Sequence, residues 1–597
     1  MNSMRYREEA IECVKDHVLQ IHKQIYAKYE GDFDRIYTEG YNSKSYTGRV
    51  IESGKVYELS YLESQGKQPL YFQNNKAYIR VRTTNIRKYM MRIIITIALF
   101  VATLVSAQGV EAQNGYISQQ DSLLQDYDYF FSQLEQIHPD PYSAFDGKDG
   151  FDKAVKQLRN ELANRDSLTL NEMQVEVTKL ISALHDGHTY IGYDKAPKKV
   201  EDQWVPLKFK VIPKGIIVNG YTPELESLKG AMLCQVEGEP LESVLDRLDK
   251  LVVSENRYGL MGNACRNIGN TNTLRQLFPT FNKEQVSMKF RMANGKDTLV
   301  SLPFYPNGPF WENIVWTSTD ERFPHKNFEY RFIDDSKQTM VMCINSIVSA
   351  DIPNLENYGL KSDVIVADVF AKMLREMKAA NSTRLIIDLR GNGGGWTMIM
   401  YAALYELYGK RFMDTDLGMN FATKVSDGWL KKNNTTLEQL NQYGGTSLKM
   451  GDFIERSSSI SSFDWFMCAD KSILEAQDGE PIYTPKEIYV VTDVQTFSSA
   501  FHTAYMLWKM GAKVVGVTSG QAPNTFMEVT RFKLPNTGLE CSASNSLQSC
   551  FPTDHPMAKA FTPDIQLSYD DYRQFDFSKD AELLFIEKLN YNENRKK

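Results

Sequence analysis

A run of glycines after an apolar segment is the first feature that could do chemistry. Residues 384–409 read RLIIDLRGNGGGWTMIMYAALYELYG, where four glycines fall between 391 and 395 and a helix-like pattern follows. Backbone amides at such a turn can bind phosphates or oxyanions. The run lacks the Lys-Ser or Lys-Thr of a phosphate loop, and Trp396 stands where a dinucleotide fingerprint needs a small residue. The sequence therefore favours a ligand other than a nucleotide, with a plain tight turn as the alternative.

A second turn of this kind carries hydroxyl groups. In VVTDVQTFSSAF, residues 490–501, Ser498 and Ser499 open a helical pattern after an apolar stretch. A serine in this place is usually an ordinary N-cap. A nucleophilic serine needs a base within reach and amide donors for the oxyanion of the tetrahedral intermediate. The glycine run offers the donors, so the base must come from elsewhere.

The eight histidines of the chain are the candidate bases. Five of them precede a signal-like segment, adjoin prolines or lie in the helix behind Ser498: His17, His22, His138, His325 and His502. The others are His185 and His188 in HDGHT and His555 in PTDHP. The His-x-x-His spacing could suggest a metal, but no matching third and fourth ligands follow, so we expect no metal site.

Size and composition exclude several classes of protein. With 597 residues, 42% apolar, 24% charged and a net charge of −7 without a long basic run, the chain is an ordinary multidomain globular protein. Nucleic acid is therefore not an expected partner. The seven cysteines form no CxxC pair, which disfavours a zinc site. Cys541 and Cys550 could form one disulfide in an oxidising compartment, or could be two semi-buried thiols.

An internal segment has the layout of a secretory signal. RKYMMRIIITIALFVATLVSAQGVEAQ begins with a basic patch at Arg87, continues with apolar residues 93–107 and ends in small residues. The apolar run is short for a membrane span, which needs roughly 20 residues. Either Met90 or Met91 is the true start, or residues 1–88 are a cytoplasmic piece ahead of a membrane anchor. Under both explanations the chain after residue 113 lies on the far side of a membrane. We therefore expect a periplasmic or secreted protein, with a membrane-anchored protein as the alternative.

The pattern of elements predicts five regions. Residues 1–89 form an extension of unknown role, and 90–112 are the signal-like segment. Residues 113–200 form a helical layer that carries His188, and 203–304 form a small β-rich, PDZ-like module with one helix. From 326 to 575 strands and helices alternate, which predicts an α/β core around a buried sheet. Functional sites in such a sheet lie where the strands end and the helices begin. We expect an irregular insertion at 411–484 in this core.

Several motifs in this order resemble peptidase family S41, the family of the C-terminal processing, or tail-specific, peptidases and the tricorn core. They are ALHDGHTYIGY, DLRGNGGG, VVTDVQTFSSAF, KVVGVTSGQAPN and FTPDIQL. The resemblance covers roughly residues 117–570. It implies a crotonase-like core of βαβ units and a serine peptidase that needs no metal or organic cofactor.

The resemblance also implies roles for individual residues. The nucleophile of the family falls on Ser498, and the amides of its oxyanion hole fall on Ser499 and Gly394. No lysine stands about 25 residues after the serine, where the processing branch has its base. The tricorn-like branch uses an upstream histidine instead, which matches His188, with His185 as the alternative.

Two positions depart from the family pattern. Phe501 replaces a glutamate that members usually carry just after the nucleophile. The third catalytic residue of the tricorn-like branch has no certain counterpart, with Asp554 and His555 as its candidates. Either departure could alter or abolish activity.

We therefore expect an exported serine peptidase that hydrolyses protein or peptide substrates through an acyl-enzyme. The β-rich module would hold the peptide, for example by strand addition, and only residues 93–107 would meet a membrane. The alternatives are an inactive peptide- or ligand-binding protein on the same scaffold and a crotonase-like protein that binds an acyl-CoA.

Overall fold

The computed structural model describes residues 35–42, 45–52, 55–62, 119–192, 203–306, 309–350, 352, 355, 361–459 and 479–593. The chain divides into two compact units, Met1–Tyr116 and Ile117–Lys597. The signal-like segment 90–112 lies outside the described residues. Within the part of the chain that is described, no helix has the length and apolar character needed to cross a membrane.

The first unit contains a three-stranded antiparallel sheet. Its strands are β1 (Arg35–Asn42), β2 (Ser45–Glu52) and β3 (Lys55–Leu62), joined in the order β1-β2-β3.

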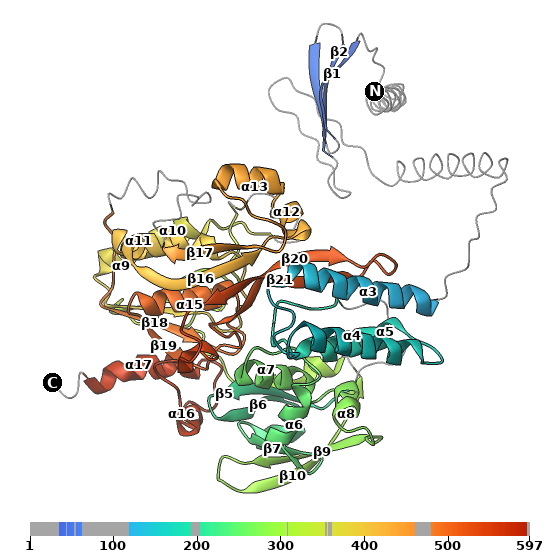
Figure 1. The fold of residues 1–597 in the computed structure, drawn as a ribbon. Helices are drawn as coiled ribbons and strands as arrows, with labels where there is room; N and C mark the ends of the chain where they lie inside the picture. The colour runs from blue at the N-terminus through green and yellow to red at the C-terminus, as the bar shows by residue number, and fades with distance from the viewer. Residues whose placement is uncertain are drawn as a thin grey trace. The chain divides into compact units, whose positions relative to one another are not determined.

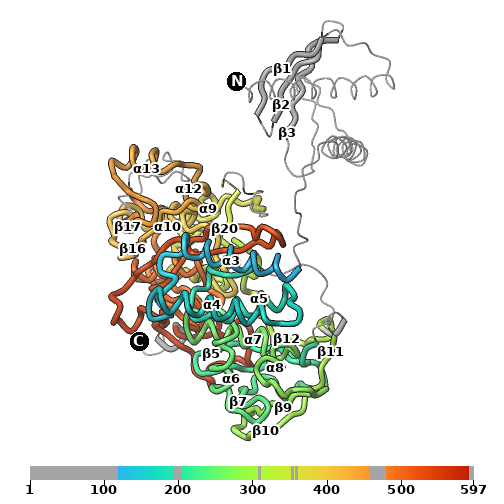
Figure 2. Tube along the Cα trace, turned by 45° about the vertical axis from the view of Figure 1, so that its right-hand side comes forward, coloured from blue at the N-terminus to red at the C-terminus, as the bar shows by residue number. Residues whose placement is uncertain are grey.

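The second unit begins with the predicted helical layer. It consists of α3 (Gln119–Ile137), α4 (Lys148–Ala163) and α5 (Leu170–Ser182), whose apolar faces share one core. The start of α5 was visible in the sequence, because Thr169 and Glu172 form a reciprocal capping box there. Figures 1 and 2 both show this layer between the β20–β21 hairpin and helix α7, so it touches two other regions of the unit.

The β-rich module is built on a seven-stranded sheet of order β10-β9-β7-β6-β12, with β5 paired to β6 and β8 paired to β7. The strands are β5 (Leu207–Ile212), β6 (Gly215–Tyr221), β7 (Met232–Val236), β8 (Glu239–Pro240), β9 (Gln285–Arg291), β10 (Asp297–Pro303) and β12 (Val315–Trp316).

Three α-helices lie in the module where the sequence predicted one. The predicted helix is α6 (Leu241–Leu248), and the others are α7 (Arg257–Asn267) and α8 (Thr271–Leu277). Helix α7 escaped prediction because it contains glycines and asparagines, which are weak helix formers. An N-cap stabilises its start, because the Asn256 side chain accepts a hydrogen bond from the Gly259 amide.

The sheet of the predicted α/β core has the order β13-β14-β15-β18-β19. Its strands are β13 (Glu329–Phe332), β14 (Thr339–Cys343), β15 (Arg384–Asp388), β18 (Glu487–Thr492) and β19 (Lys513–Gly516), and all but β13 are parallel. Helices α9 (Val366–Ala380), α10 (Thr397–Tyr408) and α15 (Ser499–Lys509) connect the parallel strands, as predicted. Because β15 and β18 are adjacent and parallel, the glycine run and the Ser498 turn begin at the same edge of the sheet.

The expectation of an irregular insertion at 411–484 was wrong for its described part. This segment supplies β16 (Asp416–Lys424) and β17 (Phe453–Ser459), which join β20 (Thr525–Lys533) and β21 (Glu540–Ser549) in a sheet of order β17-β16-β21-β20. It also contains α11 (Lys410–Asp414), α12 (Asp427–Lys432) and α13 (Leu437–Gly444). The strands were missed because serine-rich segments such as FIERSSS are poor in the β-branched and aromatic residues typical of strands.

Strand β21 also excludes the disulfide considered above. Cys541 lies at its beginning and Cys550 directly follows its end, and both are free thiols. At about 3.3 Å per residue, nine residues of extended strand separate the two by roughly 30 Å. A disulfide requires Cα atoms less than about 7 Å apart.

An ion cluster ties the end of β15 to the C-terminal helices. Arg390 donates to Asp388 Oδ2 at 2.7 Å, Asp580 Oδ1 at 3.2 Å and Glu582 Oε2 at 2.8 Å. Glu582, at the start of α17 (Ala581–Glu593), also pairs with Lys210 of β5 at 2.8 Å. Burial opposes the charge of Glu582, but the two cations lower its pKa to about 2. The cluster therefore anchors the glycine turn to the module and to α17.

Replacing Arg390 with methionine should lower the free energy of unfolding by about 3–5 kcal/mol, because three carboxylates would lose their buried partner. Urea unfolding at neutral pH measures this loss. The control is Arg159→Met, which removes an exposed pair with Asp128 and should change stability little. Equal effects of the two variants would contradict the structural role of the cluster.

Candidate active site

Ser498 occupies a strained turn between β18 and α15. It is the N-cap residue of α15 with φ 54° and ψ −124°, a backbone conformation that non-glycine residues rarely adopt. Its side chain is half-buried and makes no capping hydrogen bond to the helix. The ordinary interpretation of a serine at this place, an N-cap, therefore does not apply, and the hydroxyl is left for other chemistry.

The glycine turn lies directly against this serine. A Cβ atom on Gly394, whose φ is 108°, would stand 2.8 Å from Ser498 Cβ and 2.9 Å from the Ser499 nitrogen. Only glycine fits such an approach. The two turns predicted to meet are thus in contact.

Asn392 holds the glycine turn in place. Its Nδ2 donates to Ile344 O at 2.8 Å, and its carbonyl oxygen accepts the Phe497 amide at 3.0 Å. Its side-chain Oδ1 accepts the Gly394 amide at 2.8 Å. A substrate oxygen at this amide would therefore have to share the N–H with Asn392 or replace it, and the role of Gly394 in an oxyanion hole stays a prediction.

His188 is brought beside the nucleophile turn by the helical layer. Its ring lies 5.0 Å from the ring of Phe497, the residue before Ser498, and Gly187 packs on the same ring. The side chain is 12% exposed. Both ring nitrogens are buried, and among the described residues neither is hydrogen-bonded to Ser498. The Glu255 carboxylate and the Phe526 backbone are the polar groups near the ring. Catalytic hydrogen bonds often form only in the substrate complex. His188 therefore remains a candidate base, although it is not hydrogen-bonded to Ser498.

Glu255 is a site residue that sequence reasoning missed. Its Oε1 lies 3.6 Å from His188 Nδ1, and its side chain is 1% exposed. Oε1 accepts the Gly187 amide at 3.2 Å, and Oε2 accepts the Ala522 amide at 2.9 Å. Glu255 lies between α6 and α7 of the module, in a segment without any motif, so only the packing of the module on the core reveals it.

The two candidates for a third catalytic residue lie elsewhere. Asp554 and His555 are exposed, and the His555 ring stacks on Phe551 at 4.7 Å. Among the described residues, neither has a contact with His188. Glu255 takes the place beside the imidazole that they were expected to fill.

The charges around His188 shift its pKa. Burial disfavours the imidazolium, but the Glu255 and Asp186 carboxylates raise the pKa of His188 above its ordinary value. Burial also raises the pKa of Glu255. The paired carboxylate thus favours the imidazolium that forms when a general base takes up a proton.

Asp186 positions the loop that carries His188. Its Oδ1 accepts the His188 amide and Ser544 Oγ, each at 2.9 Å. Its Oδ2 accepts His138 Nε2 at 3.2 Å and the Thr189 hydroxyl. Burial alone would raise the pKa of Asp186, but these bonds and the nearby imidazoles hold it below the ordinary value.

Asp186, His188 and Glu255 are residue types that can also bind a metal ion. One ligand atom each of Asp186, His188 and Glu255 lie within 4.8 Å of one another. Four hydrogen bonds already occupy the oxygens of Asp186, which suits a hydrogen-bond network rather than cation coordination. His185 is turned away, because its Nδ1 donates to Ser254 O at 2.9 Å.

Phe501 does not enter the site. Its side chain is fully buried and packs on Phe561 and Tyr505, with ring centroids 5.7 and 6.0 Å away. The position belongs to the apolar core beneath α15, so the departure from the family pattern changes the core rather than the surroundings of Ser498.

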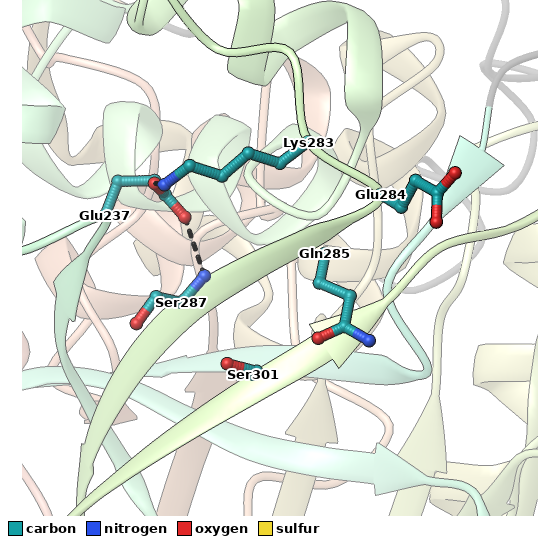
Figure 3. A pocket seen from close by; sticks show the side chains of 6 residues that line it. All are labelled: Glu237, Lys283, Glu284, Gln285, Ser287 and Ser301. Carbon is teal, nitrogen blue, oxygen red and sulfur yellow. Dashed lines mark hydrogen bonds and ion pairs between the residues drawn. The ribbon is translucent and has the colours of Figure 1, made fainter.

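A polar hollow of about 300 Å³ lies on the module, lined by Glu237, Lys283, Glu284, Gln285, Ser287 and Ser301. Figure 3 shows Glu237 bonded to the Ser287 amide and next to Lys283. None of the lining residues belongs to the site around Ser498.

The parallel core sheet and its paired turns are the arrangement with which serine hydrolases hold a nucleophile against amide donors. Residues 352–565 match the family model of peptidase family S41. The region that carries the glycine turn and Ser498 therefore resembles a serine-type peptidase of this family. His188 and Glu255 lie outside the matched residues, so their roles rest on geometry.

Several solved structures follow a similar course of chain. Mature CPAF is 17% identical with a TM-score of 0.48, over 78% of this chain and 97% of that one. The photosystem II D1 C-terminal processing protease is 12% identical with a TM-score of 0.34, over 76% and 94%. A putative S41 protease from Bacteroides fragilis is 11% identical with a TM-score of 0.35, over 78% and 97%. No curated protein matches the chain.

Proposed function

We propose that the chain is an exported peptidase in which Ser498 attacks the peptide bond and His188 is the general base. One observation carries the proposal: the strained Ser498 turn touches Gly394 on one side, while its neighbour Phe497 touches His188 on the other. These two contacts support a site in which Ser498, the amide donors and His188 act together, although residues 188 and 498 are far apart in the sequence.

The mechanism follows from these positions. Ser498 Oγ attacks the carbonyl carbon, and its proton passes to His188. The carbonyl oxygen becomes an oxyanion, which the Ser499 amide and the glycine turn stabilise. Collapse of the intermediate breaks the C–N bond, the leaving amine takes the proton from His188, and an acyl-enzyme remains. Water then attacks the ester with His188 again as base, which releases the acid and restores Ser498.

The surroundings support each step. The Ser499 amide is the first of α15, where the helix dipole favours a developing negative charge. The buried carboxylate of Glu255 stabilises the imidazolium that forms during attack. The substrates would be proteins or peptides, and strand β10, at one end of the module sheet, offers an edge to which an extended chain can add.

Export is proposed from the signal-like layout around residues 93–107. N-terminal sequencing of the protein recovered outside the cytoplasm tests it. A first residue close to 108–113 agrees with export and cleavage, whereas recovery only in the cytoplasm with residue 1 intact contradicts it.

The purified protein should hydrolyse an unfolded protein substrate and react covalently with a fluorophosphonate. Failure of both would favour the second candidate, a binding protein on this scaffold. The observation that favours it is the absence of a hydrogen bond between Ser498 and His188 among the described residues.

Replacing Glu255 with glutamine should move the acidic limb of the pH–rate profile to lower pH. The carboxylate raises the pKa of His188, and the reaction needs the neutral imidazole, so without this anion the base is neutral at lower pH. The plateau should also fall by about tenfold or more, because the imidazolium loses its counter-charge.

Profiles of kcat/KM against pH for wild type, Glu255→Gln and the exposed Glu226→Gln check this expectation. Only Glu255→Gln should differ from wild type. A limb that stays in place or moves to higher pH contradicts the pairing of Glu255 with His188.

A further inference from the structure

A chain of buried polar side chains runs behind the predicted oxyanion hole, and the mechanism above does not use it. It joins Gln548 of β21, His502 of α15, Thr397 at the start of α10 and Ser499 at the start of α15. The side chains of Ser499, His502 and Gln548 are buried, and that of Thr397 is partly buried. None of them contacts the reacting atoms directly in the mechanism, which raises the question of what the chain holds.

The tautomer of His502 follows from Gln548. The amide nitrogen of Gln548 donates to Pro523 O at 2.9 Å, so its oxygen Oε1 faces His502 Nε2 at 2.6 Å. Nε2 must therefore carry the hydrogen. Nδ1 is left with a lone pair, which accepts the Thr397 hydroxyl at 2.8 Å. Burial lowers the pKa of His502 to about 4, so this neutral tautomer persists at neutral pH.

Both ring nitrogens of His502 are thus committed to Thr397 and Gln548. The ring does not reach Ser498, and His502 is not a second base.

The far end of the chain reaches both sides of the oxyanion hole. Ser499 Oγ lies 2.7 Å from Gly395 O and 2.9 Å from Thr397 Oγ1. Because the Thr397 hydrogen goes to His502 Nδ1, the one hydrogen of Ser499 Oγ is shared between these two acceptors. Gly395 follows Gly394 in the glycine turn, while the Ser499 amide is the other predicted donor. One hydroxyl therefore links the first residue of α15 to the turn opposite it.

We infer that Thr397 and His502 are positioning residues that fix the spacing between the Ser499 amide and the glycine turn. This inference rests on the proposed function, since the spacing matters only if an oxyanion forms there. Two helix N-termini meet at this point, and without Thr397 only the Ser499–Gly395 bond holds them in register. An error of about 1 Å in the position of such donors costs roughly 100-fold in rate.

Thr397→Val tests the inference, because valine keeps the shape of threonine and removes its hydroxyl. We expect kcat to fall by about 10- to 100-fold while KM changes little, since the oxyanion exists only in the transition state and the intermediate. The rate of fluorophosphonate labelling should fall in parallel, because the phosphonyl oxygen uses the same donors. Thr397→Ser, which keeps the hydroxyl, should restore both rates.

Thr503→Val is the matched control. Thr503 is also buried in α15, but its hydroxyl bonds only to the Ser499 carbonyl one turn back, at 2.8 Å. We expect its kcat to stay close to wild type. Gln548→Asn, which shortens the side chain that holds His502, is the second variant should Thr397→Val fail to fold, and it should show the same loss confined to kcat.

Two results would overturn the inference while the proposed function stands. One is an active wild type with unchanged kcat in Thr397→Val, or in Gln548→Asn where that variant replaces it. The other is an equal loss in Thr397→Ser and Thr397→Val, which would show that packing rather than the hydroxyl matters. A wild type that neither hydrolyses peptides nor reacts with the fluorophosphonate overturns the proposed function, and the inference falls with it.

Discussion

Replacing Ser498 with alanine should reduce peptide hydrolysis by at least about 10⁴-fold and leave the protein folded. The hydroxyl makes no capping bond in α15, so its loss removes the nucleophile and little stability. The rate with an unfolded protein substrate and the thermal midpoint of unfolding, measured on the same preparation, separate the two effects.

Ser426→Ala is the matched control for this variant. Ser426 also begins a helix, but as an ordinary cap, since its Oγ accepts the Trp429 amide at 3.2 Å. Its replacement should cost about 1 kcal/mol of stability and no activity. Comparable activity of Ser498→Ala and Ser426→Ala would exclude Ser498 as the nucleophile.

Replacing His188 with glutamine should reduce kcat by about 10³-fold or more at neutral pH. Glutamine preserves a polar side chain in the buried site but cannot accept the Ser498 proton. If the imidazole is the base, the variant should also lose the acidic limb that His188 gives to the wild-type profile. Steady-state rates between pH 5 and 9 measure both effects.

His325→Gln is the control, because His325 is about half exposed and lies away from the Ser498 turn, near Asp580 at 3.9 Å. It should match wild type at every pH. A His188→Gln enzyme that keeps the wild-type rate and the wild-type limb would show that another group takes the proton.

The core of the fold could be predicted from the sequence because its signals are local. Strands β15 and β18 are short apolar runs that end in glycine or in hydroxyl residues and are followed by helical patterns. Such alternation predicts parallel strands whose ends share an edge. The contact between Gly394 and Ser498 follows from this topology, and the structure confirms it.

What escaped prediction depends on contacts between distant segments. The sheet of β16, β17, β20 and β21 has buried polar faces, as at Ser544 and Gln548, so its strands lack the apolar alternation that marks a strand. Glu255 is separated from His188 by a region of the module with no motif. Asp554 and His555 lie near the FTPDIQL motif in the sequence, but the structure leaves both in solvent.

The most direct test of the central claim is to locate a fluorophosphonate adduct on the wild-type protein by fragmenting the labelled peptide in a mass spectrometer. Fragment ions distinguish Ser498 from the adjacent Ser499, whose hydroxyl is committed to Gly395. We expect one adduct per chain, on Ser498, whose formation slows when His188 is replaced. An adduct on Ser499 or on a distant residue, or hydrolysis by a protein that takes up no label, would contradict it.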